Sequence, residues 1–411
     1  MKLADRFLKY VSIDTQSSKD STSSPSTAKQ FQLAELLYQE LKEMGIEDVR
    51  LDRKYCYIYA GIPSNLPAEK KDVPVIGLIA HMDTSPEISG AGVKARMVEN
   101  YDGEDVVLNS EQNIVLSPSV YPELKNYIGK TLIVTDGTTL LGADDKAGIA
   151  EIMTAVEELL AHPERPHGEI RIAFTPDEEI GAGVDHFDVE AFGADFAYTV
   201  DGGAEGELEY ETFNAASVNV EINGLSIHPG SAKNRMVNAS LLAAELVGYL
   251  PAEQTPAHTE GYEGFYHLYG ISGTIEKATV SYIIRDHDRN LFEEKKQYFV
   301  SVCNLMNQKY GEGTVQVEIQ DSYYNMKEMI VPHFHLIETA KKAMEMNQVA
   351  CKIAPVRGGT DGSRLSYMGI PCPNLYTGGH NYHGRFEYVC YESMKTMVQV
   401  IQTILKLYAE K

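Results

Sequence analysis

The chain has 411 residues, and 36 Lys and Arg against 59 Asp and Glu give it a formal net charge of −23. This charge repels phosphate, which argues against a nucleic-acid binder or a protein of anionic membrane surfaces. The hydrophobic content of 43% is typical of a globular protein, and the length predicts two or three domains or one domain with a large insertion.

Two further features bear on location. No apolar run approaches the roughly 18 residues of a membrane span, and the amino terminus lacks a signal-peptide core. The five cysteines are odd in number and form no C-x-x-C pair. We therefore expect a soluble cytoplasmic protein with reduced thiols and no membrane partner.

The amino-terminal half predicts strands that alternate with helices. Ser24-Pro25 is expected to open a helix that Gly45 closes, and a second helix follows from Asp145. The predicted strands are Val73–Ala80, Thr131–Val134, Gly168–Thr175 and Phe196–Val200. This alternation predicts an α/β fold with a mixed or parallel central sheet.

From about residue 214 to residue 321 the pattern changes to longer alternating strands. The predicted elements are strands at Ala216–Ile222, Thr279–Arg285 and Thr314–Ile319 and helices at Asn238–Leu250 and Asn290–Tyr310. A separate α+β domain of about a hundred residues fits this pattern. Helices near His335–Met346 and at Glu392–Tyr408 complete the chain.

Acidic and histidine residues follow the predicted strands of the first half. They are His81 and Asp83, Asp144 and Asp145, Glu178 and Glu179, and Asp201. Taken singly, each has an ordinary structural explanation, such as a helix cap, a turn or a solvated loop. Because functional groups of open α/β sheets gather at the carboxyl ends of the strands, we expect these side chains to converge.

Converging carboxylates repel one another unless a cation lies between them. A mixed oxygen and imidazole set suits zinc, manganese or cobalt better than calcium. Two divalent ions balance three ligand carboxylates and one hydroxide, which favours two ions over one. In the adjacent pair Glu178 and Glu179, one residue can then bind metal while the other serves as a general base for metal-activated water.

The ordered motifs resemble those of the co-catalytic zinc peptidases, the family that includes carboxypeptidase G-type enzymes and aminoacylases. The motifs are His81-Met82-Asp83-Thr84, the stretches 142–148 and 176–181, and Val200-Asp201-Gly202-Gly203. Further stretches resemble the tripeptide aminopeptidases of that family: 198–203, 206–214, His228-Pro229-Gly230, 357–361 and 380–384.

The resemblance implies a role for each matching residue. It implies five metal ligands, namely His81, Asp144, Glu179, Asp201 and His383, with Asp144 bridging two ions. Glu178 matches the general base and Asp83 the residue that orients His81. The peptide between Asp144 and Asp145 is expected to be cis.

Three more residues are implied to bind substrate. His228 matches a donor to the tetrahedral oxyanion, although a turn histidine before Pro229 is the ordinary explanation. Arg285 and Arg357 match anchors for the terminal carboxylate of a peptide, and structural ion pairs are the alternative.

The resemblance also implies the architecture and the activity. We expect an α/β/α catalytic domain with a mixed sheet, formed by residues 1–213 and 325–411, interrupted by an α+β lid and dimerisation domain at 214–324. The expected enzyme is a cytoplasmic homodimer with two zinc ions, for which cobalt or manganese substitute in vitro, and it cleaves tripeptides at the amino end. A carboxypeptidase, an N-acyl-amino-acid deacylase of the same family and a non-catalytic relict remain the alternatives.

Overall fold

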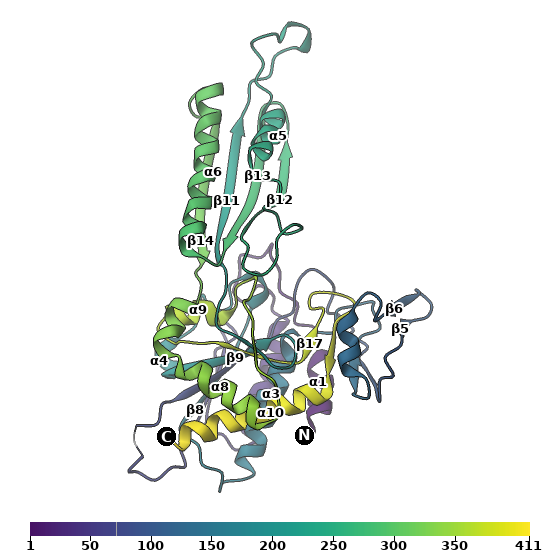
Figure 1. Cartoon of the computed structure of the whole chain (residues 1–411), viewed down its shortest axis with the longest axis vertical. Helices are drawn as coiled ribbons and strands as arrows, with labels where there is room; N and C mark the ends of the chain where they lie inside the picture. The colour runs from purple at the N-terminus through teal and green to yellow at the C-terminus, as the bar shows by residue number, and fades with distance from the viewer. Residues whose placement is uncertain (71) are drawn as a thin grey trace. The chain divides into compact units, whose positions relative to one another are not determined.

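The computed structural model describes residues 1–70 and 72–411, which divide into two units (Figure 1). The first unit comprises Met1–Tyr210, Glu328–Ala354 and Thr360–Lys411, and the second comprises Glu211–Lys327 with Pro355–Gly359. The short piece Pro355–Gly359 groups with the second unit, although the sequence predicted it in the last catalytic segment.

An eight-stranded mixed sheet forms the centre of the first unit. In spatial order its strands are β1 (Asp48–Leu51), β2 (Ile58–Ile62), β8 (Ile170–Thr175), β3 (Ile76–His81), β9 (Phe196–Gly202), β16 (Asn374–Tyr376), β10 (Glu207–Glu209) and β15 (Lys352–Ile353). Strands β8, β3, β9 and β16 run parallel, whereas β1 with β2, β2 with β8 and β16 with β10 are antiparallel. The predicted mixed sheet is confirmed.

Helices cover both faces of this sheet. Phe192 and Leu365, from α4 (Val189–Phe192) and α9 (Asp361–Tyr367), pack with Ala197 of β9. The next residue, Tyr198, points to the opposite face, where its hydroxyl donates to the carbonyl of Leu336. The helices α1 (Leu3–Val11), α3 (Ala143–Leu160), α8 (His335–Met346) and α10 (Tyr391–Ala409) pack together around β3, β9 and β10. The α/β/α arrangement is therefore confirmed.

Strand β7 (Leu132–Val134) lies outside the central sheet, which corrects one sequence expectation. It pairs antiparallel with β4 (Arg96–Val98) and β18 (Tyr388–Cys390), and β17 (Gly379–His380) completes that four-stranded sheet. Between β4 and β7 the chain forms a hairpin of β5 (Val106–Asn109) and β6 (Ile114–Leu116) and the short helix η1 (Pro122–Tyr127). Asp144 therefore does not reach the site from a strand of the central sheet.

Helix α2 (Gln30–Glu43) begins later than Ser24-Pro25 predicted. The Ser24–Pro25 peptide is cis, and both the backbone N–H and the hydroxyl of Ser26 donate to the Asp177 carboxylate. These tertiary hydrogen bonds hold the segment in a turn and delay the helix. The remaining short helices are η2 (Glu178–Ile180), η3 (Pro229–Ser231), α7 (Lys327–Ile330) and η4 (Val331–His333).

The second unit is a four-stranded antiparallel sheet with two helices (Figure 1). Its strands, in spatial order, are β12 (Phe265–Gly273), β13 (Lys277–Asp286), β11 (Asn214–Asn223) and β14 (Val315–Tyr323), and its helices are α5 (Ala239–Tyr249) and α6 (Arg289–Tyr310). Val218, Val220 and Ile222 alternate along β11 into a core with both helices. Among the described residues, no helix is long and apolar enough to cross a membrane.

Candidate metal centre

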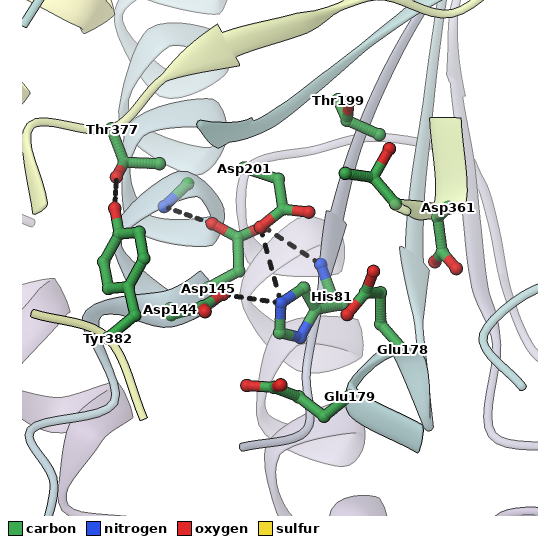
Figure 2. Close-up of polar contacts among 12 residues, drawn as sticks. His81, Asp144, Asp145, Glu178, Glu179, Thr199, Asp201, Asp361, Thr377 and Tyr382 are labelled. Atoms are coloured by element: carbon green, nitrogen blue, oxygen red, sulfur yellow. Dashed lines mark hydrogen bonds and ion pairs between the residues drawn. The ribbon is translucent and has the colours of Figure 1, made fainter. Parts of the chain in front are cut away.

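Five predicted ligands form two groups that share Asp144. Nε2 of His81 lies 2.8 Å from Oδ1 of Asp144 and 3.5 Å from Oδ1 of Asp201 (Figure 2). Nε2 of His383 lies 3.2 Å from Oδ2 of Asp144 and 2.9 Å from Oε2 of Glu179. In each group the three ligand atoms lie within 4.8 Å of one another. Asp144 thus offers one oxygen to each group, the geometry of a bridging carboxylate.

Three adjacent parallel strands deliver three of these residues. His81 ends β3, Asp201 lies one residue before the end of β9, and Glu179 lies in η2, just after β8. Because β8, β3 and β9 run parallel, their carboxyl ends meet at one edge of the sheet. The structure brings these residues together there, as the strand-end argument predicted.

Asp144 and His383 arrive from turns. Asp144 lies at the start of α3, with non-helical backbone angles and the expected cis peptide to Asp145. His383 lies between β17 and β18 with a φ of 61°, in the left-handed region that few non-glycine residues adopt. A strand-end argument alone does not find His383.

The pKa values of the residues in this cluster are those expected of a cation-binding site. Burial and the charge of Asp144 raise the pKa of Glu179 to about 8, and burial raises that of Asp201 to about 6. Burial lowers the pKa of His383, but hydrogen bonds to Asp144 and Glu179 outweigh it and raise the value to about 11. Oε1 of Glu179 is buried and has no hydrogen-bond partner among the described residues. Without metal, protons must take the place of positive charge, so the donor set fits divalent ions.

Glu178 and Glu179 have different surroundings although they are adjacent. Figure 2 shows the Glu178 carboxylate on the side of Asp361 and the Glu179 carboxylate below the His81 ring. Glu178 belongs to neither ligand group. Burial, followed by the charges of Asp201 and Asp361, raises its pKa well above the ordinary value, although His81 opposes the shift. Such a carboxyl group binds a proton more readily than an ordinary glutamate, as a general base must.

Asp83 is fully buried and contacts both His81 and the η2 turn. Its Oδ1 lies 3.3 Å from Nδ1 of His81, and its own carbonyl oxygen lies 3.1 Å from the same nitrogen. Oδ1 also accepts the backbone N–H of Glu178 at 2.9 Å, and Oδ2 accepts that of Glu179 at 3.2 Å. The carboxylate therefore supports the two glutamates as well as the histidine.

Sequence reasoning missed two residues close to His383 in the chain, Tyr382 and Glu387. The Tyr382 hydroxyl donates to the carbonyl of Gly202, and the Glu387 carboxylate accepts backbone N–H groups of residues 141, 142 and 144. It treated Asp145 only as part of the acidic set, yet Asp145 accepts the backbone N–H of His81 at 3.1 Å. These contacts join residues far apart in sequence, so no local pattern reveals them.

The three predicted substrate residues all belong to the second unit. His228 is exposed, and its Nδ1 accepts the backbone N–H of Gly230 at 3.1 Å. The neutral ring therefore carries its proton on Nε2, which leaves that nitrogen as a donor.

The two arginines differ in how their donors are used. Arg285 donates through Nη1 to the Arg357 carbonyl at 3.1 Å, while its buried Nε has no partner among the described residues. Arg357 donates to the carbonyls of Gly261 and Glu263 and to the hydroxyl of Thr259. Its guanidinium also lies 5.1 Å from the centre of a phenylalanine ring, that of Phe213. Within the described chain neither arginine forms an ion pair, so the alternative of structural ion pairs has no support.

The chain is similar in sequence to known peptidases. Residues 135–407 match the family described as peptidase family M20/M25/M40. The chain is 59% identical over 408 residues to peptidase T of Alkaliphilus oremlandii, covering 99% of each chain. It is 57% identical over 410 residues to peptidase T of Halothermothrix orenii, covering 100% of each.

Solved structures share the fold. A tripeptidase from Staphylococcus aureus superposes with a TM-score of 0.77 at 21% identity, covering 100% of this chain and 98% of that one. An aminopeptidase PepT from Bacillus cereus gives a TM-score of 0.74 at 23% identity, covering 100% and 98%. A dinuclear metal-binding peptidase of the M20 family from Bacillus subtilis gives 0.65 at 15% identity, covering 99% and 98%.

Proposed function

Because this chain belongs to peptidase family M20/M25/M40, and within it to the peptidase T proteins, we propose that it removes the amino-terminal residue from tripeptides at its buried acid and histidine cluster. The chain is a hydrolase of the metallopeptidase class. The observation that carries the proposal is the pair of ligand groups that share Asp144, with Glu178 beside them.

The proposed cofactor is a pair of zinc ions. His81 and Asp201 would hold one ion and Glu179 and His383 the other, with Asp144 contributing to both. Bound zinc makes a water molecule more acidic and polarises the carbonyl of the scissile peptide. Cobalt and manganese take similar ligands and are the proposed substitutes in vitro.

Glu178 is the proposed general base. Its carboxylate accepts no hydrogen bond from a described residue, so it is available to take a proton from the attacking water. Water then adds to the first peptide carbonyl, and Glu178 returns the proton to the departing amine. Asp83 keeps Glu178 in place through the backbone of η2.

The second unit supplies the proposed substrate contacts. His228 presents Nε2–H as a donor to the oxyanion. Nε of Arg285, which has no partner within the described residues, is suited to a peptide carboxylate. The Arg357 side chain already uses its Nη donors within the unit, so we assign it the support of Arg285 through its carbonyl.

We also propose that residues 214–324 act as a lid and as the homodimer contact. Tyr269 and Ile271 on the edge strand β12 are more than half exposed, at 54% and 52%, and offer apolar surface to a second copy. A cytoplasmic location is proposed from the five free cysteines, four of them buried.

The test is product analysis of a tripeptide with three different residues, incubated with the zinc-loaded protein. We expect release of the first residue and the remaining dipeptide, loss of activity with a chelator and recovery with zinc. A tripeptide with a blocked amino terminus should not be cleaved. Release of the last residue would instead identify a carboxypeptidase, and cleavage of only the blocked peptide a deacylase.

A further inference from the structure

Glu387 is a buried carboxylate that binds the backbone of the Asp144 turn. Only 1% of the residue is exposed. Its Oε2 accepts the backbone N–H groups of Leu141 at 2.7 Å and Gly142 at 2.8 Å, and its Oε1 accepts that of Asp144 at 3.1 Å. One side chain thus satisfies three donors that precede or begin α3.

In the part of the chain that the structure describes, no side chain close in sequence accepts from these donors. The first N–H groups of a helix lack intrahelical partners and usually receive a cap from a nearby side chain. The residue at that position here is Gly142, with a φ of 80° and no side chain to offer. Glu387 supplies the missing acceptor from 243 residues further along the chain than Asp144.

The same short segment carries His383 and a second tie. Tyr382 donates through its hydroxyl to the Gly202 carbonyl at 2.9 Å, and Gly202 directly follows Asp201. The segment from Tyr382 to Glu387 therefore contacts the backbone next to two proposed ligands and itself holds a third.

We infer that Glu387 is a positioning residue. It holds the backbone of Asp144 where the two carboxylate oxygens of Asp144 face the two ligand groups, one of which contains His383. Among the described residues its carboxylate forms hydrogen bonds only with backbone N–H groups of the Asp144 turn, so it acts on Asp144 through the backbone. This inference rests on the proposed metal site.

The test compares Glu387→Gln with the unchanged protein. Glutamine keeps one carbonyl oxygen, but its NH₂ group must face at least one of the three N–H donors. In the metal-free protein we expect the Gly142 and Asp144 amides to exchange hydrogen at least about tenfold faster, because their hydrogen bonds weaken. The Glu178 and Glu179 amides, which Asp83 holds, should be unchanged.

Zinc affinity, measured by competition with a chromophoric chelator, should fall about 10–100-fold, the usual effect of removing a partner that orients a ligand. Glu40→Gln is the matched control, since Glu40 is a buried carboxylate of the same unit bound to Arg6, Lys9 and Tyr10. That control should leave zinc affinity unchanged. If Glu387→Gln does not fold, Glu387→Asp, which keeps the charge and shortens the reach, is judged by the same two measurements.

Unchanged amide exchange or unchanged zinc affinity in the variant would overturn the inference. The proposed function fails separately, if the unchanged protein itself binds no zinc. A variant that loses zinc affinity while the unchanged protein cleaves tripeptides supports both.

Discussion

Asp83 and Glu178 are joined by a hydrogen bond of 2.9 Å from the Glu178 backbone N–H to Oδ1 of Asp83. The same carboxylate lies beside His81, so one buried side chain fixes the histidine and the turn that carries both glutamates. The proposed metal site and the proposed general base therefore share a support.

Asp83→Asn tests that shared support. Its NH₂ group would face an N–H donor in η2, so we expect zinc affinity or kcat/KM to fall about 10–100-fold. Steady-state kinetics with a zinc titration measures both. Asp195→Asn is the control, because Asp195 also accepts a backbone N–H, that of Val75, on an exposed loop. Equal behaviour of the two variants would contradict the role of Asp83.

The variants Glu178→Gln and Glu179→Gln distinguish the proposed general base from the proposed metal ligand. The Glu178 variant should keep its metal and lose about 10²–10⁴-fold in kcat, the usual contribution of a general base. The Glu179 variant should lose metal, since its carboxylate belongs to a ligand group. Kinetics together with elemental analysis distinguishes the two. A Glu178 variant with a near-normal rate would remove that residue from its role.

Asp144→Asn should weaken the binding of both ions, whereas Asp201→Asn should weaken only one. The reason is that Asp144 belongs to both ligand groups and Asp201 to a single group. Elemental analysis after dialysis against metal-free buffer gives the stoichiometry. Retention of two ions by the Asp144 variant would rule out a bridging carboxylate.

Arg285→Lys keeps a positive charge but removes Nε–H, the donor that has no partner among the residues the structure describes. We expect KM for a free tripeptide to rise about tenfold, because a planar two-point contact to the carboxylate is lost. A tripeptide amide has no carboxylate and should show the same KM with both proteins. A KM that rises equally for both peptides would point to a structural effect.

Glu40 provides a prediction on the pH dependence of stability. Burial raises its pKa, but hydrogen bonds from Lys9 and Tyr10 and the charge of Arg6 outweigh burial and lower it. A lowered pKa stabilises the folded state above the ordinary carboxyl value and loses that effect as the pH falls through the folded value. Glu40→Gln should therefore reduce the free energy of unfolding at pH 7 by about 2 kcal/mol, and by less near pH 4. Urea unfolding at the two pH values measures the difference, and an equal loss at both would contradict the argument.

The sequence predicted the parts of the site that depend on local patterns. The apolar runs of β3 and β9 identify buried strands. Because functional side chains gather at the carboxyl ends of such strands, the sequence predicts that His81 and Asp201 lie close together. Strand β7 shows the limit of such reasoning, because a three-residue apolar run does not say which sheet it joins. Edge strand β12 was missed because Tyr269 and Ile271 are exposed and its register shifts between Leu268 and Gly270, which breaks the alternation.

The supporting contacts could not be predicted for a different reason. Glu387 and Asp83 act through hydrogen bonds to backbone groups 95 or more residues away, and backbone donors leave no mark in the sequence. Ser26 likewise bonds to Asp177 instead of starting a helix, which no local propensity indicates.

The second unit is assembled from two separate pieces of chain, so the backbone passes between the units after Tyr210, Lys327, Ala354 and Gly359. Arg357 belongs to the shorter piece, yet its guanidinium binds Thr259 and Gly261 in the longer one. A chimaera that carried only residues 211–327 on another catalytic domain would lose these hydrogen bonds. An exchange of the second unit between related proteins therefore has to carry residues 355–359 together with residues 211–327.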